Sequence, residues 1–148
     1  DQREKVLAAM PEVDRAAIFT MATGSTASLE HCLELAGSEV WPAWRETLRE
    51  AASRSKEAGT GVAQGLQAAL APSANVSIAH RVAALRLIAY AGRAEHARSV
   101  LPSLDDTANH VKVAAVNALR MMVDGDEPLD KLSTFDAIER ANKWKARL

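Results

Sequence analysis

The sequence predicts an all-α fold of stacked antiparallel helical hairpins, and three observations favour it. Thirty of the 148 residues are alanine, which has the highest intrinsic helix propensity, and runs of β-branched residues are few. Turn-forming residues divide the chain into short stretches, each long enough for one helix. A pattern of small and branched apolar residues also recurs after 31 residues, as it does in helical-repeat arrays. We expect no β-sheet.

Glycine, proline and small polar residues mark where each helix is expected to end and the next to begin. GTG at 59–61, APSAN at 71–75 and DGDEP at 124–128 are clear examples of such turns. The expected helices are 2–9, 12–23, 26–36, 40–57, 62–70, 77–91, 94–103, 107–123, 128–133 and 136–147.

Length and charge restrict the class of protein. The chain, 1–148, is expected to be a single domain and a fragment of a longer protein. Its 18 basic and 19 acidic residues give a formal net charge of −1, which is not typical of a nucleic-acid or membrane-surface binder. No run of about 18 apolar residues could span a bilayer, and the chain opens with no signal peptide. We therefore expect a soluble piece, whose compartment the sequence does not identify.

The recurring pattern links three expected helices. AALRLI at 83–88 aligns with AAVNAL at 114–119, and AAIFTM at 16–21 is a third copy that lies 67 residues before the first. The longer helix expected at 40–57 accounts for the wider spacing. A helical unit that repeats in this way buries its apolar face against its neighbours, which indicates an array rather than a closed bundle.

Two cations lie within the apolar arc of these helices. Arg81 follows Asn75 by six residues, and Lys112 follows Asp106 by the same interval. The pattern resembles HEAT-type α-helical repeats, in which an aspartate in the turn and a basic residue six positions later form a ladder between successive units. The resemblance covers residues 60–123 well and the first 59 loosely, and it implies a right-handed α-solenoid (HEAT-like, ARM-like) of about five units.

Under this resemblance, the ladder consists of Asn75, Arg81, Asp106 and Lys112. Asn75 departs from the family pattern because an amide carries no charge, so Arg81 is free to pair with Asp105 or Asp106 of the next unit instead. A buried cation is tolerated when it is paired and hydrogen-bonded, and such a pair holds the register of two units. The alternative is that each cation extends to a solvent edge.

One narrow strip of the helix at 77–91 faces away from its apolar arc, and the repeat places equivalent strips on 107–123 and 12–23. Arginine, methionine and aromatic residues, which are enriched in protein interfaces, occupy much of this strip. In a helical array such strips would align along the concave face. The candidate protein-binding ridge is Phe19, Arg86, Tyr90, Asn117 and Met121.

The sequence contains no pattern that predicts a catalytic, cofactor or metal site. His31 and Cys32 are adjacent on an expected helix, so their side chains point in different directions and do not form a nucleophile and base. His80, His96 and His110 do not recur at a spacing of four, which would place two ligands on one helical face. A single cysteine also excludes an internal disulfide.

The resemblance implies a non-catalytic scaffold or protein–protein interaction module that uses the concave face of the array. The expected partner is a protein or peptide segment, including another domain of the parent chain, with no membrane, no nucleic acid and no cofactor. The chain is more faintly similar to the HEAT-like segments of large bacterial proteins that also carry a β-propeller and a c-type haem domain. HEAT-like arrays also occur in DNA alkylation-repair glycosylases and bilin lyases, which leaves an enzyme as the alternative.

Overall fold

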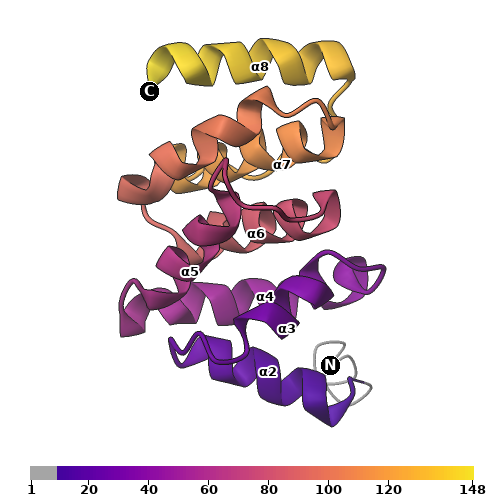
Figure 1. Ribbon diagram of the computed structural model, residues 1–148, viewed down its shortest axis with the longest axis vertical. Coiled ribbons are helices and arrows are strands. Elements are labelled where there is room, and N and C mark those ends of the chain that lie inside the picture. The colour runs from indigo at the N-terminus through magenta and orange to yellow at the C-terminus, as the bar shows by residue number, and fades with distance from the viewer. Residues whose placement is uncertain (1–9) are drawn as a thin grey trace.

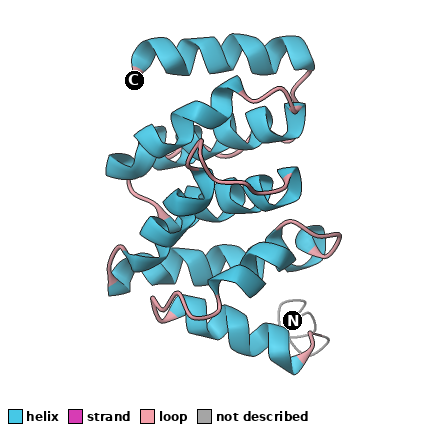
Figure 2. Ribbon diagram, in the orientation of Figure 1, coloured by secondary structure: helices cyan, strands magenta, loops and turns pink. Residues whose placement is uncertain are grey.

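The computed structural model describes residues 10–148, and this part of the chain is helical without any strand (Figure 2). The predicted all-α class is confirmed for these residues. The helix expected at 2–9 lies outside the described residues. No helix within 10–148 is long and apolar enough to cross a membrane.

The helices follow the predicted order, with most ends within three residues of the expected positions. α4 continues as a short 3₁₀ turn, η1, and α7 continues as a π turn, η3. The elements are α2 (Glu12–Ala22), α3 (Leu29–Ala36), α4 (Trp41–Ser55), η1 (Lys56–Ala58), α5 (Gly61–Leu70), α6 (Ile78–Ala91), η2 (Ala94–Asp105), α7 (Asn109–Leu119), η3 (Arg120–Asp124) and α8 (Thr134–Arg147).

Successive helices stack along the long axis of the molecule, with α2 at one end and α8 at the other (Figure 1). α2 packs on α4, α4 on α6, α6 on α7, and α7 on α8. The intervening helices pack against this row: α3 contacts α4 and α6, α5 contacts α6, and η2 contacts α7. Contacts are therefore made mainly between elements that are near neighbours in the sequence.

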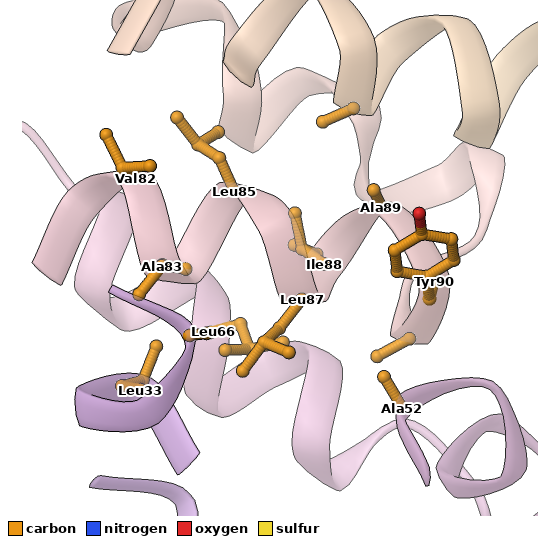
Figure 3. Packing of buried hydrophobic residues seen from close by; sticks show 14 of the residues in the cluster. Leu33, Ala52, Leu66, Val82, Ala83, Leu85, Leu87, Ile88, Ala89 and Tyr90 are labelled. Atoms are coloured by element: carbon orange, nitrogen blue, oxygen red, sulfur yellow. The ribbon is translucent and has the colours of Figure 1, made fainter. Parts of the chain in front are cut away.

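α6 lies at the centre of the core and is apolar around most of its circumference. Leu85 and Leu87 are both fully buried, although they point to opposite sides of the helix (Figure 3). Leu87 faces Leu66 of α5 on the same side as Leu33 of α3, whereas Leu85 points away from them (Figure 3). Burying apolar side chains on both sides makes α6 the element that joins the two halves of the stack.

The predicted repeat agrees with the pattern of burial on α2, α6 and α7. Ala84, Leu85 and Ile88 are buried, and so are the residues aligned with them on the other two helices. These equivalents are Ala17, Ile18 and Met21 on α2, and Ala115, Val116 and Leu119 on α7. Burial is thus shared at these three aligned positions but not at all of them, since Leu87 is fully buried and the aligned Thr20 is only half-buried.

Two expected α-helices are wrong. Residues 128–133 form no helix, because the backbone N–H and carbonyl of Leu129 both bond to the side chain of Asn117 and are not available for a helical ladder. Residues Ala94–Asp105 form a 3₁₀ helix instead of the α-helix expected at 94–103. Pro102 lies inside this helix and lacks the N–H that an α-helix needs in its interior.

A close approach between α3 and α6 requires Gly37. A Cβ atom at this position would lie only 2.6 Å from the carbonyl oxygen of Ala79, at the start of α6. A backbone atom cannot rotate away as a side chain can, so a residue larger than glycine would push the end of α3 and the start of α6 apart. The end of α3 and the start of α6 are thereby held together beside the groove described next.

Candidate binding groove

A groove of about 940 Å³ lies between α6 and α7. Its floor is formed by one face of each of these helices, and its walls by the start of α4 and by the loop at 128–133. Ser77 caps α6 by accepting a hydrogen bond from the His80 N–H at 3.1 Å, and Ser133 caps α8 by accepting one from Asp136 at the same distance. These caps fix the start of α6, whose face lines the groove, and the start of α8, where the loop at 128–133 ends.

Four of the five residues of the predicted ridge line this groove, namely Arg86, Tyr90, Asn117 and Met121. The fifth, Phe19, is 72% exposed on α2 and does not line the groove. The four residues on α6 and α7 therefore share one groove, whereas Phe19 lies apart from them.

The predicted ridge is also less exposed than expected. Tyr90 is only 7% exposed, and Arg49 lies over its ring at 5.2 Å from the centroid. Arg86, Asn117 and Met121 are half-buried. α4 and the loop at 128–133 cover residues that an isolated helix would leave in solvent.

Arg86 is held in place by two contacts with neighbouring helices. Its Nη1 donates a hydrogen bond to the carbonyl oxygen of Ala36 at 2.6 Å, and its guanidinium lies 5.0 Å from the centroid of the Trp41 ring. Burial lowers the pKa of Arg86 from its ordinary value, and the nearby charge of Arg45 lowers it further. The groove therefore contains two neighbouring guanidinium groups.

Asn117 fastens the loop at 128–133 to α7. Its Nδ2 donates to the carbonyl oxygen of Leu129 at 3.1 Å, and its Oδ1 accepts from the N–H of the same residue at 2.8 Å. A side-chain amide can form both bonds because it has a donor and an acceptor. Asn117 is therefore a structural part of the groove wall as well as a lining residue.

Asn117→Leu should release this loop, because an apolar side chain of similar size can neither donate to the Leu129 carbonyl nor accept from the Leu129 N–H. We expect the amide of Leu129 to exchange with deuterium about tenfold faster or more, which corresponds to the loss of roughly 1.4 kcal/mol or more. Hydrogen-exchange mass spectrometry would measure this change. Unchanged exchange at Leu129 in the folded variant would show that other contacts hold the loop.

The structure revises the predicted ladder. Arg81 Nη1 lies 2.7 Å from Asp106 Oδ2, so the pair links α6 to the turn that precedes α7. This is one of the alternatives left open by the uncharged Asn75, which is exposed. Asp106 Oδ1 accepts from the N–H of Ala108 at 2.8 Å. Within residues 10–148 no ion pair joins Asp106 to Lys112, so that predicted pair is wrong.

The physical reason for the change of partner lies in the position of Asp106. Its two carboxylate oxygens are occupied by the N–H of Ala108 and by Arg81, and only 14% of its side chain is exposed. A planar guanidinium matches the geometry of a carboxylate better than a lysine ammonium does. The contact joins α6 to the turn that precedes α7.

His31 and Cys32 make separate contacts and do not form a catalytic pair. His31 Nε2 lies 2.6 Å from Asp14 Oδ1, whereas the Cys32 thiol contacts the carbonyl oxygen of Ala17 at 3.4 Å. Cys32 is fully buried, and this burial raises the pKa of its thiol to about 11, with a hydrogen bond to Ser28 acting in the opposite direction. The thiolate is therefore scarce at neutral pH.

Cys32 should react slowly with thiol reagents while the protein is folded. Raising the pKa from 9.0 to about 11 lowers the thiolate fraction near pH 8 about 100-fold, and burial also blocks access. We expect the folded protein to react with a chromogenic disulfide at least about 100-fold more slowly than the protein unfolded in denaturant. Equal rates would mean that Cys32 is exposed in solution.

The sequence did not identify several residues that line the groove. Trp41 and Arg45 belong to the start of α4, a helix on which the sequence predicts no binding residue. They are four residues apart and therefore lie on one helical face, so the helical period alone could have grouped them. Asn109, Asp130 and Lys131 also line the groove, but they lie at a helix start and in a loop, where no period applies.

No family model, no curated protein and no solved structure matches the chain. Among residues 10–148, no group of three or more histidine, cysteine, aspartate or glutamate side chains is arranged to hold a metal ion. The groove is therefore the candidate site on which a functional proposal can be based.

Proposed function

We propose that the chain is a non-catalytic docking module, a HEAT-like α-solenoid segment that holds part of another protein, or another domain of its parent chain, in the groove between α6 and α7. The observation that carries this proposal is the groove itself. It is lined by Trp41, Tyr90 and Met121 together with Arg86 and Asn117. Such a mixture of aromatic, flexible apolar and hydrogen-bonding side chains is typical of protein interfaces.

The solenoid interpretation is supported by two features of the fold. Three aligned positions are buried on each of α2, α6 and α7, as expected when similar units stack on one another. The pair between Arg81 and Asp106 connects one unit to the next, and it is half-buried. Both features favour an open array whose successive inner helices share one face.

The docking proposal can be tested by selecting peptides from a random displayed library on the immobilised protein. A matched pair of variants then identifies the binding surface. Ala114→Trp fills the groove, where Ala114 is half-buried, and Ala68→Trp places the same side chain on an exposed position of α5 outside the groove. We expect the selected peptides to bind the wild type and Ala68→Trp equally, and to bind Ala114→Trp at least about tenfold more weakly.

Circular dichroism and the denaturation midpoint would show that both variants are folded. Peptides that bind all three proteins equally, or the absence of any selected peptide, would contradict docking in this groove. Both results would be informative because the groove is preformed by the fold, and a preformed site needs no ordering step before it binds.

A nucleic-acid-binding enzyme is the second candidate, and one observation favours it. Arg45, Arg86 and Lys131 line the groove together with Trp41 and a carboxylate, Asp130. Cations, an aromatic ring and an acid are what a base-excising enzyme would need. Titration of fluorescent duplex and single-stranded DNA at 50 and 200 mM salt separates the candidates, because phosphate-driven binding falls steeply over that range. Strong, salt-dependent binding would favour the enzyme.

A further inference from the structure

The charges within the groove are unbalanced. Arg45, Arg86 and Lys131 line it, whereas Asp130 is the one carboxylate among the described residues that do so. His110 is the remaining titratable side chain at the surface of the groove besides Tyr90. The groove is therefore positive although the whole chain has a net charge of −1.

Arg45 and Arg86 lack the carboxylate partner that several other described arginines have. Arg81, Arg147 and Arg54 each contact a carboxylate, at 2.7, 2.6 and 3.2 Å. Within residues 10–148 no ion pair includes Arg45 or Arg86, and Arg86 bonds to a neutral carbonyl oxygen instead. Arg45 and Arg86 are half-buried and their positive charges repel each other, so binding an external anion between them would be favourable.

Two residues that line the groove each carry a buried polar atom without a hydrogen-bond partner in residues 10–148. These atoms are Arg45 Nε, which is a donor, and Asn109 Oδ1, which is an acceptor. A buried polar group without a partner is unfavourable, so a turn of either side chain toward a matching ligand in the groove would be favoured. A carboxylate matches the donor, and a peptide N–H matches the acceptor.

We propose that the occupant of the groove is an acidic, partly apolar protein segment, in which an Asp or Glu carboxylate is bound by Arg45 and Arg86. Trp41, Ile78 and Met121 supply the apolar surface for the residues that flank the carboxylate, and Ile78 is 54% exposed in the groove. This inference rests on the proposed docking function and specifies the chemistry of the partner.

A carboxylate fits these observations better than a nucleic-acid backbone does. A polyanion needs an extended positive surface, and this chain has a small negative net charge. The loop at 128–133 also places Asp130 at the groove, which would repel successive phosphates. A single carboxylate between two guanidinium groups needs no extended positive surface, meets the repulsion of Asp130 only once, and gains charge-assisted hydrogen bonds.

The test uses the peptides selected on the full chain from the random library described above. We expect Asp and Glu to be enriched among them at one position next to apolar residues. Replacing that acid by its amide, in a synthetic peptide titrated against the wild-type protein, should weaken binding about tenfold or more. This arm requires no protein variant, so it remains decisive even if a groove variant fails to fold.

Protein variants provide the matching arm. Arg45→Gln and Arg86→Gln should each weaken binding of the acidic peptide about tenfold but leave its amide form little changed, because only the acidic peptide uses the charge. Arg98→Gln is the control, since Arg98 is exposed on η2 outside the groove. Arg45→Lys should restore part of the affinity.

The outcomes separate this inference from the docking function on which it rests. Peptides that bind in the groove, as judged by Ala114→Trp, but show no dependence on an acid would overturn the acidic partner and leave docking intact. Failure to obtain any groove-dependent peptide would overturn both. Binding of a fluorescent single-stranded oligonucleotide that is lost in Arg45→Gln would overturn the carboxylate in favour of a polyanion.

Discussion

Replacing Leu85 by alanine is expected to lower the free energy of unfolding by about 2–5 kcal/mol. Leu85 is fully buried on α6, in a core whose other members include many alanines. Short side chains cannot move far enough to fill the space left by a leucine, so much of the cavity should persist. Urea denaturation monitored by circular dichroism would measure the change through the midpoint and slope of the transition.

Ile78→Ala is the matched control for this prediction. Ile78 lies on the same helix and lines the same groove, but it is 54% exposed. Its loss should change the free energy of unfolding by no more than about 0.5 kcal/mol, because little apolar contact is removed. Similar effects of the two substitutions would contradict the position of α6 at the centre of the core.

Asp106→Ala is expected to destabilise the protein by about 1–3 kcal/mol. The substitution leaves Arg81 without its carboxylate, which lies 2.7 Å away, and removes the acceptor of the Ala108 N–H. Asp106→Asn keeps an oxygen for Ala108 and should recover part of the loss. Thermal or urea denaturation of the two variants would distinguish the contribution of the Ala108 hydrogen bond from that of the ion pair with Arg81.

Lys112→Ala serves as the control, since it removes a cation from α7 that forms no ion pair with Asp106 in the described part of the chain. Its effect should be within about 0.5 kcal/mol. A double-mutant cycle between Arg81→Met and Asp106→Ala should yield a favourable coupling energy. A larger loss in Lys112→Ala than in Asp106→Ala would restore the pairing that the sequence alone suggested.

The positions of the helices could be predicted because they depend on local chemistry. Alanine favours helix, while glycine and proline end it, and these effects act over a few residues. Gly59 and Gly125 end η1 and η3, close to the predicted turns, with φ angles of 131° and 69° that other residues rarely adopt. The loop at 128–133 could not be predicted, because it depends on Asn117, 12 residues before Leu129.

The candidate site was predictable only where it follows the helical period. Arg86, Tyr90, Asn117 and Met121 were identified from the period because each faces the same direction on its helix. The contributions of Trp41 and Asp130 depend on how α4 and a loop pack against α6 and α7. That packing is not encoded in the order of residues on any single helix.

The sequence by itself determined the helical content, the recurring apolar pattern on α2, α6 and α7, and the sides of α6 and α7 on which Arg86, Tyr90, Asn117 and Met121 lie. The tertiary structure alone decided that Arg81, rather than Lys112, binds Asp106, and that Arg45 lies near Arg86. Charged side chains are long and can reach more than one partner, so spacing along the chain leaves several pairings open. Which pairing forms depends on distance and burial in the folded chain, because electrostatic interactions strengthen steeply as water is excluded.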